Sequence, residues 1–279
     1  MPAVSGSQRW KVLRRSATFW VGLGITTMWV FFAIFGDFIA PYDPLGVPQD
    51  ILNRLAPPSA EHWFGTDELG RDVLSRVMAG ARSVMTIALA ATVIGTVVGT
   101  AVGLMVGYFG GILDDIVGRI LDAFLSIPLV ITGLLALAAL GPNTFGVVIV
   151  IGLVFTPLIA KTVRAAVLSE RQLDYVTAAQ LRRENSFYIL FVEILPNVTS
   201  VIVVEFTVRL GYAIFTILAL AFLGFGIEPS VPDWGLAISQ HYSYLTGNVW
   251  WPVLFPALAI ASLVVGVNLL ADGISQAVE

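Results

Sequence analysis

Six long apolar stretches, separated by shorter polar segments, dominate the pattern of this chain. They cover about residues 18–38, 84–109, 116–140, 144–168, 196–225 and 250–270. An α-helix rises about 1.5 Å per residue, so about 20 apolar residues cross a hydrocarbon core about 30 Å thick. The pattern therefore predicts an all-α integral membrane protein with six transmembrane helices, the third of which contains Pro128.

The charges that flank these stretches indicate how the chain crosses the membrane. Four basic residues and no acidic ones precede the first stretch: Arg9, Lys11, Arg14 and Arg15. Basic residues beside a span favour the cytoplasmic side. We therefore expect residues 1–17 to be a cytoplasmic N-terminal segment and residues 18–279 to be one transmembrane domain. After six crossings, the C-terminus would be cytoplasmic as well.

Residues 40–83 form the longest polar region and would be extracytoplasmic in this orientation. Prolines punctuate its first part, as is typical of a loop, at Pro41, Pro44, Pro48, Pro57 and Pro58. Further along, Thr66 or Asp67 is suited to cap a short helix, because both side chains accept hydrogen bonds from the first backbone N–H groups of a helix.

Residues 169–195 form the longest polar segment in the second half of the chain and would be cytoplasmic. The composition from Ser169 to Arg182 favours a helix, and Asn185 then suits a turn and the start of a second helix. Pro196 is suited to the first turn of the next span. We therefore expect a short helix, a turn and a second helix at the cytoplasmic surface.

Composition narrows the chemistry that the chain can perform. The chain is 57% hydrophobic and 12% charged, whereas soluble domains carry about 25% charged residues. It has no cysteine, and its two histidines, His62 and His241, are too far apart in sequence to form a recognisable metal pair. We therefore expect no catalytic, cofactor or metal site in this chain.

Motifs for nucleotide binding and for hydrolysis are missing from the sequence. It contains no G-x-x-x-x-G-K-[ST] stretch for ATP, no G-x-S-x-G and no H-E-x-x-H. A membrane enzyme, which is one alternative, would therefore lack an evident nucleophile and base. The chain also lacks an evident energy source of its own.

Four glycines spaced by four residues lie in the second apolar stretch, at Gly95, Gly99, Gly103 and Gly107. On a helix they form one nearly continuous groove, which lets a second helix approach closely. We expect this groove to serve helix packing.

Two short motifs in the cytoplasmic segment resemble the "EAA" loop of ABC-importer permeases: residues 174–179 (DYVTAA) and 194–197 (ILPN). Five further stretches are similar to the dipeptide/oligopeptide/nickel branch of that family, and within it to the second, or C, permease subunit: residues 40–44, 64–72, 107–111, 222–226 and 234–235. The resemblance covers essentially the whole chain, and the motifs follow the family order.

This resemblance implies the type I importer permease fold and a place in an ATP-driven importer of peptides in the bacterial cytoplasmic membrane. Such a permease pairs with a second permease subunit, and two cytoplasmic ATPases, which bind ATP and Mg²⁺, dock on the loops of the pair. An extracytoplasmic binding protein delivers the solute. The chain itself would bind no cofactor and no nucleic acid.

The resemblance assigns ATPase docking to the loop helix, at Asp174, Tyr175, Val176, Thr177, Ala178, Ala179, Arg182 and Arg183. Three positions depart from the family pattern, because Thr177 replaces a usual Glu, Arg183 a usual Gly and Glu193 a frequent His. Glycine best tolerates a left-handed backbone conformation. We therefore expect Asn185 to form the left-handed turn in place of position 183.

Glu205 and Arg209 are charged residues within the fifth span, four positions apart, so their side chains meet on one helix face. Charges inside a span are costly unless they are paired or face water. The pair therefore either neutralises itself at the contact with the second permease, or lines the translocation path and meets the termini of a peptide. Asp122 in the third span is a further candidate.

Two other transport functions stay open at this point. An ion-coupled secondary transporter would need intramembrane carboxylates, for which Glu205 and Asp122 are the main candidates. An ABC importer of a non-peptide solute, such as a metal chelate, is the other, because a separate binding protein can carry most of the specificity.

Overall fold

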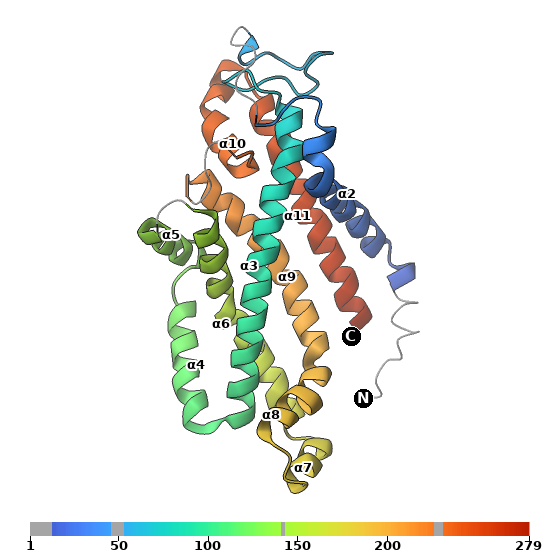
Figure 1. Cartoon of the computed structure of the whole chain (residues 1–279), viewed down its shortest axis with the longest axis vertical. Coiled ribbons are helices and arrows are strands. Elements are labelled where there is room, and N and C mark those ends of the chain that lie inside the picture. The colour runs from blue at the N-terminus through green and yellow to red at the C-terminus, as the bar shows by residue number, and fades with distance from the viewer. Residues whose placement is uncertain (1–12, 46–52, 141–142, 226–230, 279) are drawn as a thin grey trace.

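The computed structural model describes residues 13–45, 53–140, 143–225 and 231–278, and every named element in these ranges is a helix (Figure 1). The longer helices are α2 (Ala17–Ile39), α3 (Val73–Phe109), α4 (Gly111–Leu125), α5 (Leu129–Leu140), α6 (Thr144–Glu170), α9 (Leu195–Phe222) and α11 (Trp251–Val278). The short ones are α7 (Asp174–Leu181), α8 (Ser186–Tyr188), the π-helical η2 (Ile189–Ile194), α10 (Trp234–His241) and the 3₁₀-helical η3 (Tyr242–Gly247). Arg9, Lys11, Pro48 and Gly226, which figure in the predictions above, lie outside the described residues.

Five helical stretches of the described chain are long and apolar enough to cross a membrane, and a sixth crossing exists if α4 and α5 count as one broken span. The predicted all-α membrane architecture is therefore confirmed. The short helices α7 and α8 lie at one end of the bundle, and α10 lies at the opposite end beside the loop that precedes α3 (Figure 1). We call these the α7 end and the α10 end.

The third predicted span is not one continuous helix. The chain bends by 87° between α4 and α5. Pro128 immediately precedes α5, lacks a backbone N–H and disfavours a helical conformation in the residue before it, so the helix stops there. A cleft of about 210 Å³ lies at the bend, lined by Pro128 and by Pro157 of α6. The third predicted span, residues 116–140, is therefore present only as two helices broken at Pro128, which count as one crossing if the pair is one broken span.

The second span begins earlier than its apolar stretch predicts, at Val73 instead of residue 84. Its N-cap is Asp72, whose carboxylate accepts a hydrogen bond from the backbone N–H of Ser75 (2.8 Å). The expected caps Thr66 and Asp67 belong instead to a tight turn, closed by an isolated antiparallel bridge between Thr66 and Asp72. The predicted short helix at this point is therefore wrong, and the helix cap lies five residues beyond Asp67, at Asp72.

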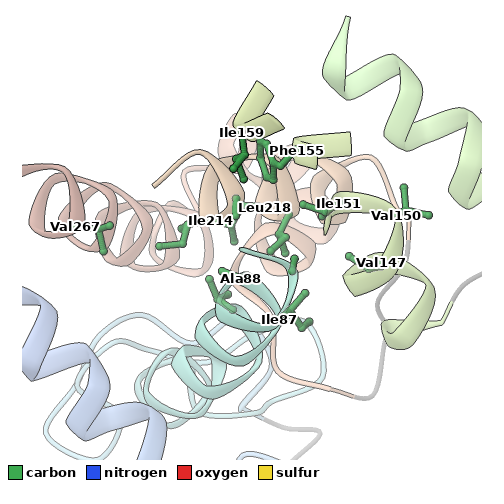
Figure 2. Packing of buried hydrophobic residues seen from close by; sticks show 14 of the residues in the cluster. Ile87, Ala88, Val147, Val150, Ile151, Phe155, Ile159, Ile214, Leu218 and Val267 are labelled. Carbon is green, nitrogen blue, oxygen red and sulfur yellow. The ribbon is translucent and has the colours of Figure 1, made fainter. Parts of the chain in front are cut away.

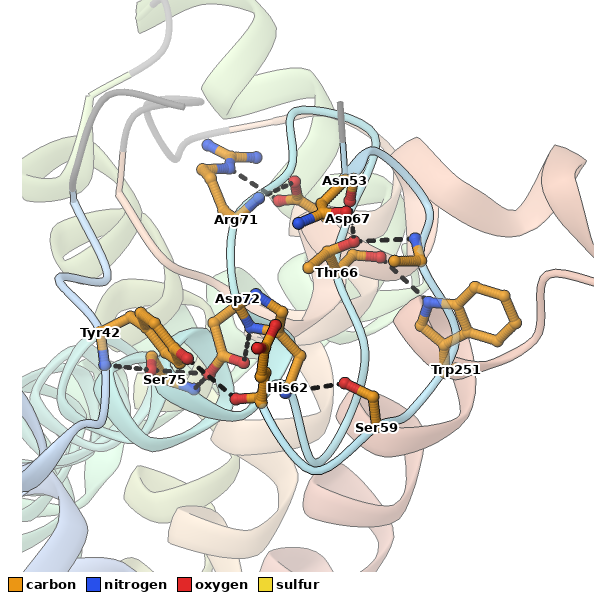
Figure 3. A network of polar contacts seen from close by, with 12 residues as sticks. Tyr42, Asn53, Ser59, His62, Thr66, Asp67, Arg71, Asp72, Ser75 and Trp251 are labelled. Carbon is orange, nitrogen blue, oxygen red and sulfur yellow. Dashed lines mark hydrogen bonds and ion pairs between the residues drawn. The ribbon is translucent and has the colours of Figure 1, made fainter. Parts of the chain in front are cut away.

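Side chains of this turn are held by a polar network (Figure 3). Asp67 Oδ1 accepts from the backbone N–H groups of Leu69 (2.8 Å) and Arg71 (2.9 Å). The indole N–H of Trp251, at the start of α11, donates to the carbonyl of Thr66 (3.0 Å). The loop before α3 is therefore hydrogen-bonded to the start of α11 at the α10 end of the bundle.

The glycine groove of α3 packs directly against α6, as its spacing predicts. A Cβ added to Gly95, Gly99, Gly103 or Gly107 would lie 2.7–2.8 Å from an atom of α6, closer than real Cβ contacts permit. Gly152 of α6 makes a reciprocal approach, because a Cβ there would lie 2.9 Å from Ile94. The packing role of the groove is confirmed.

The hydrophobic core lies where α3, α6, α9 and α11 meet (Figure 2). It contains Ile87 and Ala88 of α3, Phe155 and Ile159 of α6, and Ile214 of α9, each at most 3% exposed. This core fixes α6 and α9, the two helices that carry the elements described next.

Gly103→Ala is expected to destabilise the chain by about 1–3 kcal/mol, the usual cost of overpacking a well-packed core. The new methyl group would lie 2.7 Å from the carbonyl oxygen of Ala160 and 2.8 Å from Cβ of Val163, and neither neighbour is a flexible side-chain tip. The control is Gly118→Ala in α4, where no atom lies within 4 Å of the added Cβ. It should instead stabilise by about 0.5–1 kcal/mol through helix propensity. Thermal melting of the two variants checks these expectations. Equal changes in melting temperature for Gly103→Ala and Gly118→Ala would contradict the prediction.

Candidate functional site

Helix α7 projects from the bundle beyond α6 and α9 (Figure 1). One face of it packs onto the chain itself, since Val176 and Ala179 are both fully buried (0% exposed). The opposite face carries Thr177 and Ala178, which are exposed. The predicted docking residues therefore divide into two groups, one that anchors the helix and one that is presented outward.

Tyr175 links α7 to both neighbouring spans. Its hydroxyl donates a hydrogen bond to Oε2 of Glu170 at the end of α6 (2.6 Å) and accepts one from the amide of Asn197 in α9 (3.2 Å). Burial, together with the Glu170 carboxylate, raises the pKa of Tyr175, so the hydroxyl remains a donor at neutral pH. Tyr175 therefore connects α7 to both α6 and α9 by hydrogen bonds.

Arg183 itself adopts the left-handed conformation at the end of α7, with φ 57°. The N–H of Glu184 donates to the carbonyl of Ala179 (3.2 Å), and the N–H of Arg183 to that of Gln180 (2.9 Å). These two bonds define a Schellman motif, which requires a left-handed residue at this position. The expectation that Asn185 forms the turn is wrong, because Asn185 has φ −65° and caps α8.

The same motif closes α9, where it is formed by a glycine. Gly224 has φ 82°, and the N–H groups of Gly224 and Phe225 donate to the carbonyls of Ala221 (2.9 Å) and Leu220 (2.9 Å). A residue with a side chain pays about 1–2 kcal/mol in this conformation, and glycine does not. Arg183 is therefore a strained position at the end of the predicted docking helix.

Arg183→Gly is expected to raise the melting temperature of the purified complex by about 2–4 °C, since about 1 kcal/mol of strain is removed. Part of the gain is offset by the greater freedom of glycine in the unfolded chain. Arg183→Ala is the control, because it removes the guanidinium but keeps the strain. A lower melting temperature for Arg183→Gly than for Arg183→Ala would refute this account.

Arg182 and Glu193 meet across the loop, because the guanidinium of Arg182 lies 3.3 Å from Oε1 of Glu193 and 3.5 Å from Oε1 of Glu184. Glu193, which departs from the family pattern, therefore supplies a partner for the end of α7. The Arg182 side chain is half exposed, so we expect this contact to contribute little stability.

Leu181 is an exposed apolar residue on the outward face of α7, and it was not among the predicted docking residues. It is 80% exposed and follows Thr177 by four positions and Ala178 by three, so the three side chains share one face. The sequence alone did not mark Leu181, because the outward face of α7 is defined only by the burial of Val176 and Ala179 on the other face. We call Thr177, Ala178 and Leu181 the outward face of α7.

Glu205 and Arg209 form an ion pair within α9, with N–O distances of 2.9 Å. The hydroxyl of Thr162 on α6 donates to Oε1 of Glu205 (3.0 Å), and both charged side chains are about 15% exposed. The guanidinium also lies 5.7 Å from the ring centroid of Tyr212. The predicted pairing is present, and α6 completes it.

Asp122 lies in α4 and pairs with Lys161 of α6. A second ion pair, between Asp114 and Arg164, joins the same two helices. The structure therefore does not place Asp122 in the Glu205–Arg209 pair. Two adjacent residues of α6 contact the two sites, since Lys161 pairs with Asp122 and Thr162 donates to Glu205. These contacts across helices have no direct signal in the sequence.

Apolar helices long enough to cross a membrane, packed through a glycine groove and with a short helix held beyond one end of them, define this chain as an integral membrane protein. The chain belongs to the family of binding-protein-dependent transport system inner membrane components, whose model matches residues 99–279. A second family model, the N-terminal TM domain of oligopeptide transport permease C, matches residues 6–58. The protein is thus an inner-membrane permease subunit of an ABC importer.

Individual relatives agree with this family assignment. The chain is 39% identical to the dipeptide transport system permease protein DppC of Escherichia coli (strain K12), over 100% of this chain and 94% of that protein. It is 36% identical to the di/tripeptide transport system permease protein DppC of Pseudomonas aeruginosa (strain UCBPP-PA14), over 92% of this chain and 86% of that protein. A chain of the inward-facing MetNI methionine ABC transporter matches 73% of this chain and 96% of its own length, with a TM-score of 0.59 at 20% identity. That structure supports the fold alone.

Proposed function

We propose that this chain is one of two permease subunits of an importer of dipeptides or other short peptides. The relatives named above support the peptide class, since they are 36–39% identical over nearly their whole length and are named for dipeptides and tripeptides. The observation that carries the mechanism is the outward face of α7, which is free in this chain while the same helix is anchored to two spans.

In this proposal the α7 end faces the cytoplasm, together with both chain termini, and the α10 end faces an extracytoplasmic binding protein. Two ATPases, which bind ATP and Mg²⁺, dock on the outward face of α7 and on its counterpart in the second permease subunit. Tyr175, held by Glu170 and Asn197, then transmits ATPase closure to α6 and α9 as a rigid-body movement.

We assign Glu205 and Arg209 a structural role within this mechanism. Their charges are compensated inside the chain by one another and by Thr162, so neither requires a ligand. The pair holds α6 against α9, the two spans that move with α7. Asp122 pairs with Lys161 between α4 and α6, but both of these side chains are exposed, unlike those of Glu205 and Arg209.

The experiment that tests the function is uptake of a labelled dipeptide by bacteria that carry or lack this chain. Uptake should depend on the chain, should stop when ATP is depleted and should continue when an uncoupler removes the ion gradient while ATP is maintained. Loss of uptake with the uncoupler alone would contradict ATP-driven transport. A metal chelate or another non-peptide solute that competes fully with the dipeptide would contradict the peptide class.

A further inference from the structure

A small cavity of about 20 Å³ lies at the α10 end, between α3, α10 and the start of α11. Its polar lining consists of Arg76 of α3, Asp67 of the preceding loop, the α10 N-cap Asp233 and His241 of α10, and its apolar lining includes Val77. Measured as the volume open to the centre of a water molecule, about 10–15 Å³ is needed to hold one water. The cavity therefore has room for a single water.

Two buried atoms of its lining have no hydrogen-bond partner in the described residues: Oδ2 of Asp233 and Nε2 of His241. Their side chains are nearly inaccessible, since Asp233 is 3% and His241 2% exposed. The remaining polar atoms of both residues are occupied. Asp233 Oδ1 accepts from the N–H of Leu236 (2.9 Å), and His241 Nδ1 lies 2.6 Å from the carbonyl oxygen of Ala237.

The contact with Ala237 fixes the role of each ring nitrogen. A carbonyl oxygen can only accept, so Nδ1 of His241 must carry the hydrogen, and in the neutral ring Nε2 is then an acceptor. Asp233 Oδ2 is also an acceptor when the carboxyl group is ionised. Burial raises the pKa of Asp233 to about 6, which still leaves it ionised at neutral pH. Two acceptors that face one cavity require a donor with two hydrogens between them.

The charges around the cavity favour water over an ion. Arg76 lines it, donates through Nη1 to the carbonyl of Pro44 (3.0 Å) and lies 3.8 Å from Asp67 Oδ2. A cation would face the guanidinium of Arg76, and an anion would face the carboxylates of Asp67 and Asp233. Water can donate to both acceptors and accept from Arg76, which gives the three hydrogen bonds that are usual for a buried water.

We propose that this cavity is a specific site for one buried water molecule, which donates to Asp233 and His241, accepts from Arg76 and thereby joins α10 to α3. The site adds to a direct link between the same helices, because the indole N–H of Trp234 donates to the carbonyl of Val77 (2.9 Å). The water is a structural component of the α10 end and does not depend on the proposed solute.

The test is a cryo-EM or crystal structure of the assembled wild-type transporter at a resolution that shows ordered waters. We expect one density peak within about 2.6–3.2 Å of Asp233 Oδ2 and His241 Nε2, with a guanidinium nitrogen of Arg76 at a similar distance. An empty cavity, or direct contact between Oδ2 and Nε2, would overturn the proposal. A peak with ligand distances near 2.3 Å would also overturn it, because such distances indicate a metal ion.

A double-mutant cycle provides a second measurement. Asp233→Asn keeps the helix cap, His241→Phe removes Nε2, and a shared water predicts that their effects on the melting temperature deviate from additivity by about 2–4 °C. The matched control combines Asp233→Asn with His62→Phe, since His62 pairs directly with Asp72 (3.0 Å) in a separate network. The control should be additive, and additivity in both cycles would count against the shared water.

Discussion

Ala178→Asp combined with Leu181→Asp is expected to abolish peptide uptake and to release the ATPases from the purified complex, while the permease itself remains folded. Both side chains lie on the outward face of α7 and make no contribution to the chain's own core, Leu181 being 80% exposed. A carboxylate that becomes buried at a protein interface without a partner costs several kcal/mol. Two of them would eliminate an interface of ordinary affinity.

Two controls distinguish docking from folding in this experiment. Ala60→Asp makes the same substitution at an exposed alanine of the α10 end, and it should leave the ATPases bound. Ala179→Asp buries a charge in the chain's own core, where Ala179 is 0% exposed, so it should lower the amount of folded permease. Retention of the ATPases by the Ala178→Asp, Leu181→Asp permease would refute the docking role of α7.

The spans and their glycine groove could be predicted from the sequence because both depend on local pattern. The length of an apolar stretch indicates whether it can cross a membrane. Glycines at every fourth residue of a helix lie on one face, whatever that face contacts. The bend before α5 could be predicted only in part. Pro128 marks a break, but its angle of 87° depends on how α4 and α5 pack against α6, where Pro157 lines the same cleft.

The face that α7 presents could not be read from the sequence alone. Ala178 and Ala179 are chemically identical, and only the packing of the helix shows that one is exposed and the other buried. Arg183 shows a different limit. The family pattern marked the position as unusual, but composition favoured Asn185 for the turn, whereas the hydrogen bonds of the last helical turn assign it to position 183.

The ion pairs of the spans could be predicted from the sequence only in part. Glu205 and Arg209 could be paired from their spacing within one helix. Their third partner Thr162 comes from another helix, and so does Lys161, the partner of Asp122. A single sequence does not specify which faces of two helices meet, so such contacts require the structure.

Arg209→Leu is expected to abolish uptake by destabilising the permease, and removal of both charges is expected to restore it. The single change leaves the largely buried carboxylate of Glu205 with Thr162 as its remaining polar contact, which typically costs about 3–5 kcal/mol. The double variant Glu205→Leu, Arg209→Leu removes the unpaired charge, and replacement of a buried pair by apolar side chains is often neutral. The measurement is uptake together with the yield and melting temperature of the assembled complex.

The charge swap Glu205→Arg, Arg209→Glu separates a structural pair from one that reads the peptide. The swapped pair can still form across one helical turn, and the Thr162 hydroxyl can accept from an arginine as readily as it donates to a glutamate. A structural pair therefore predicts near-normal uptake by the swap and by the double leucine variant. If both variants assemble with normal melting temperatures but fail to transport, the two charges must meet the solute, and the structural assignment of Glu205 and Arg209 would have to be abandoned.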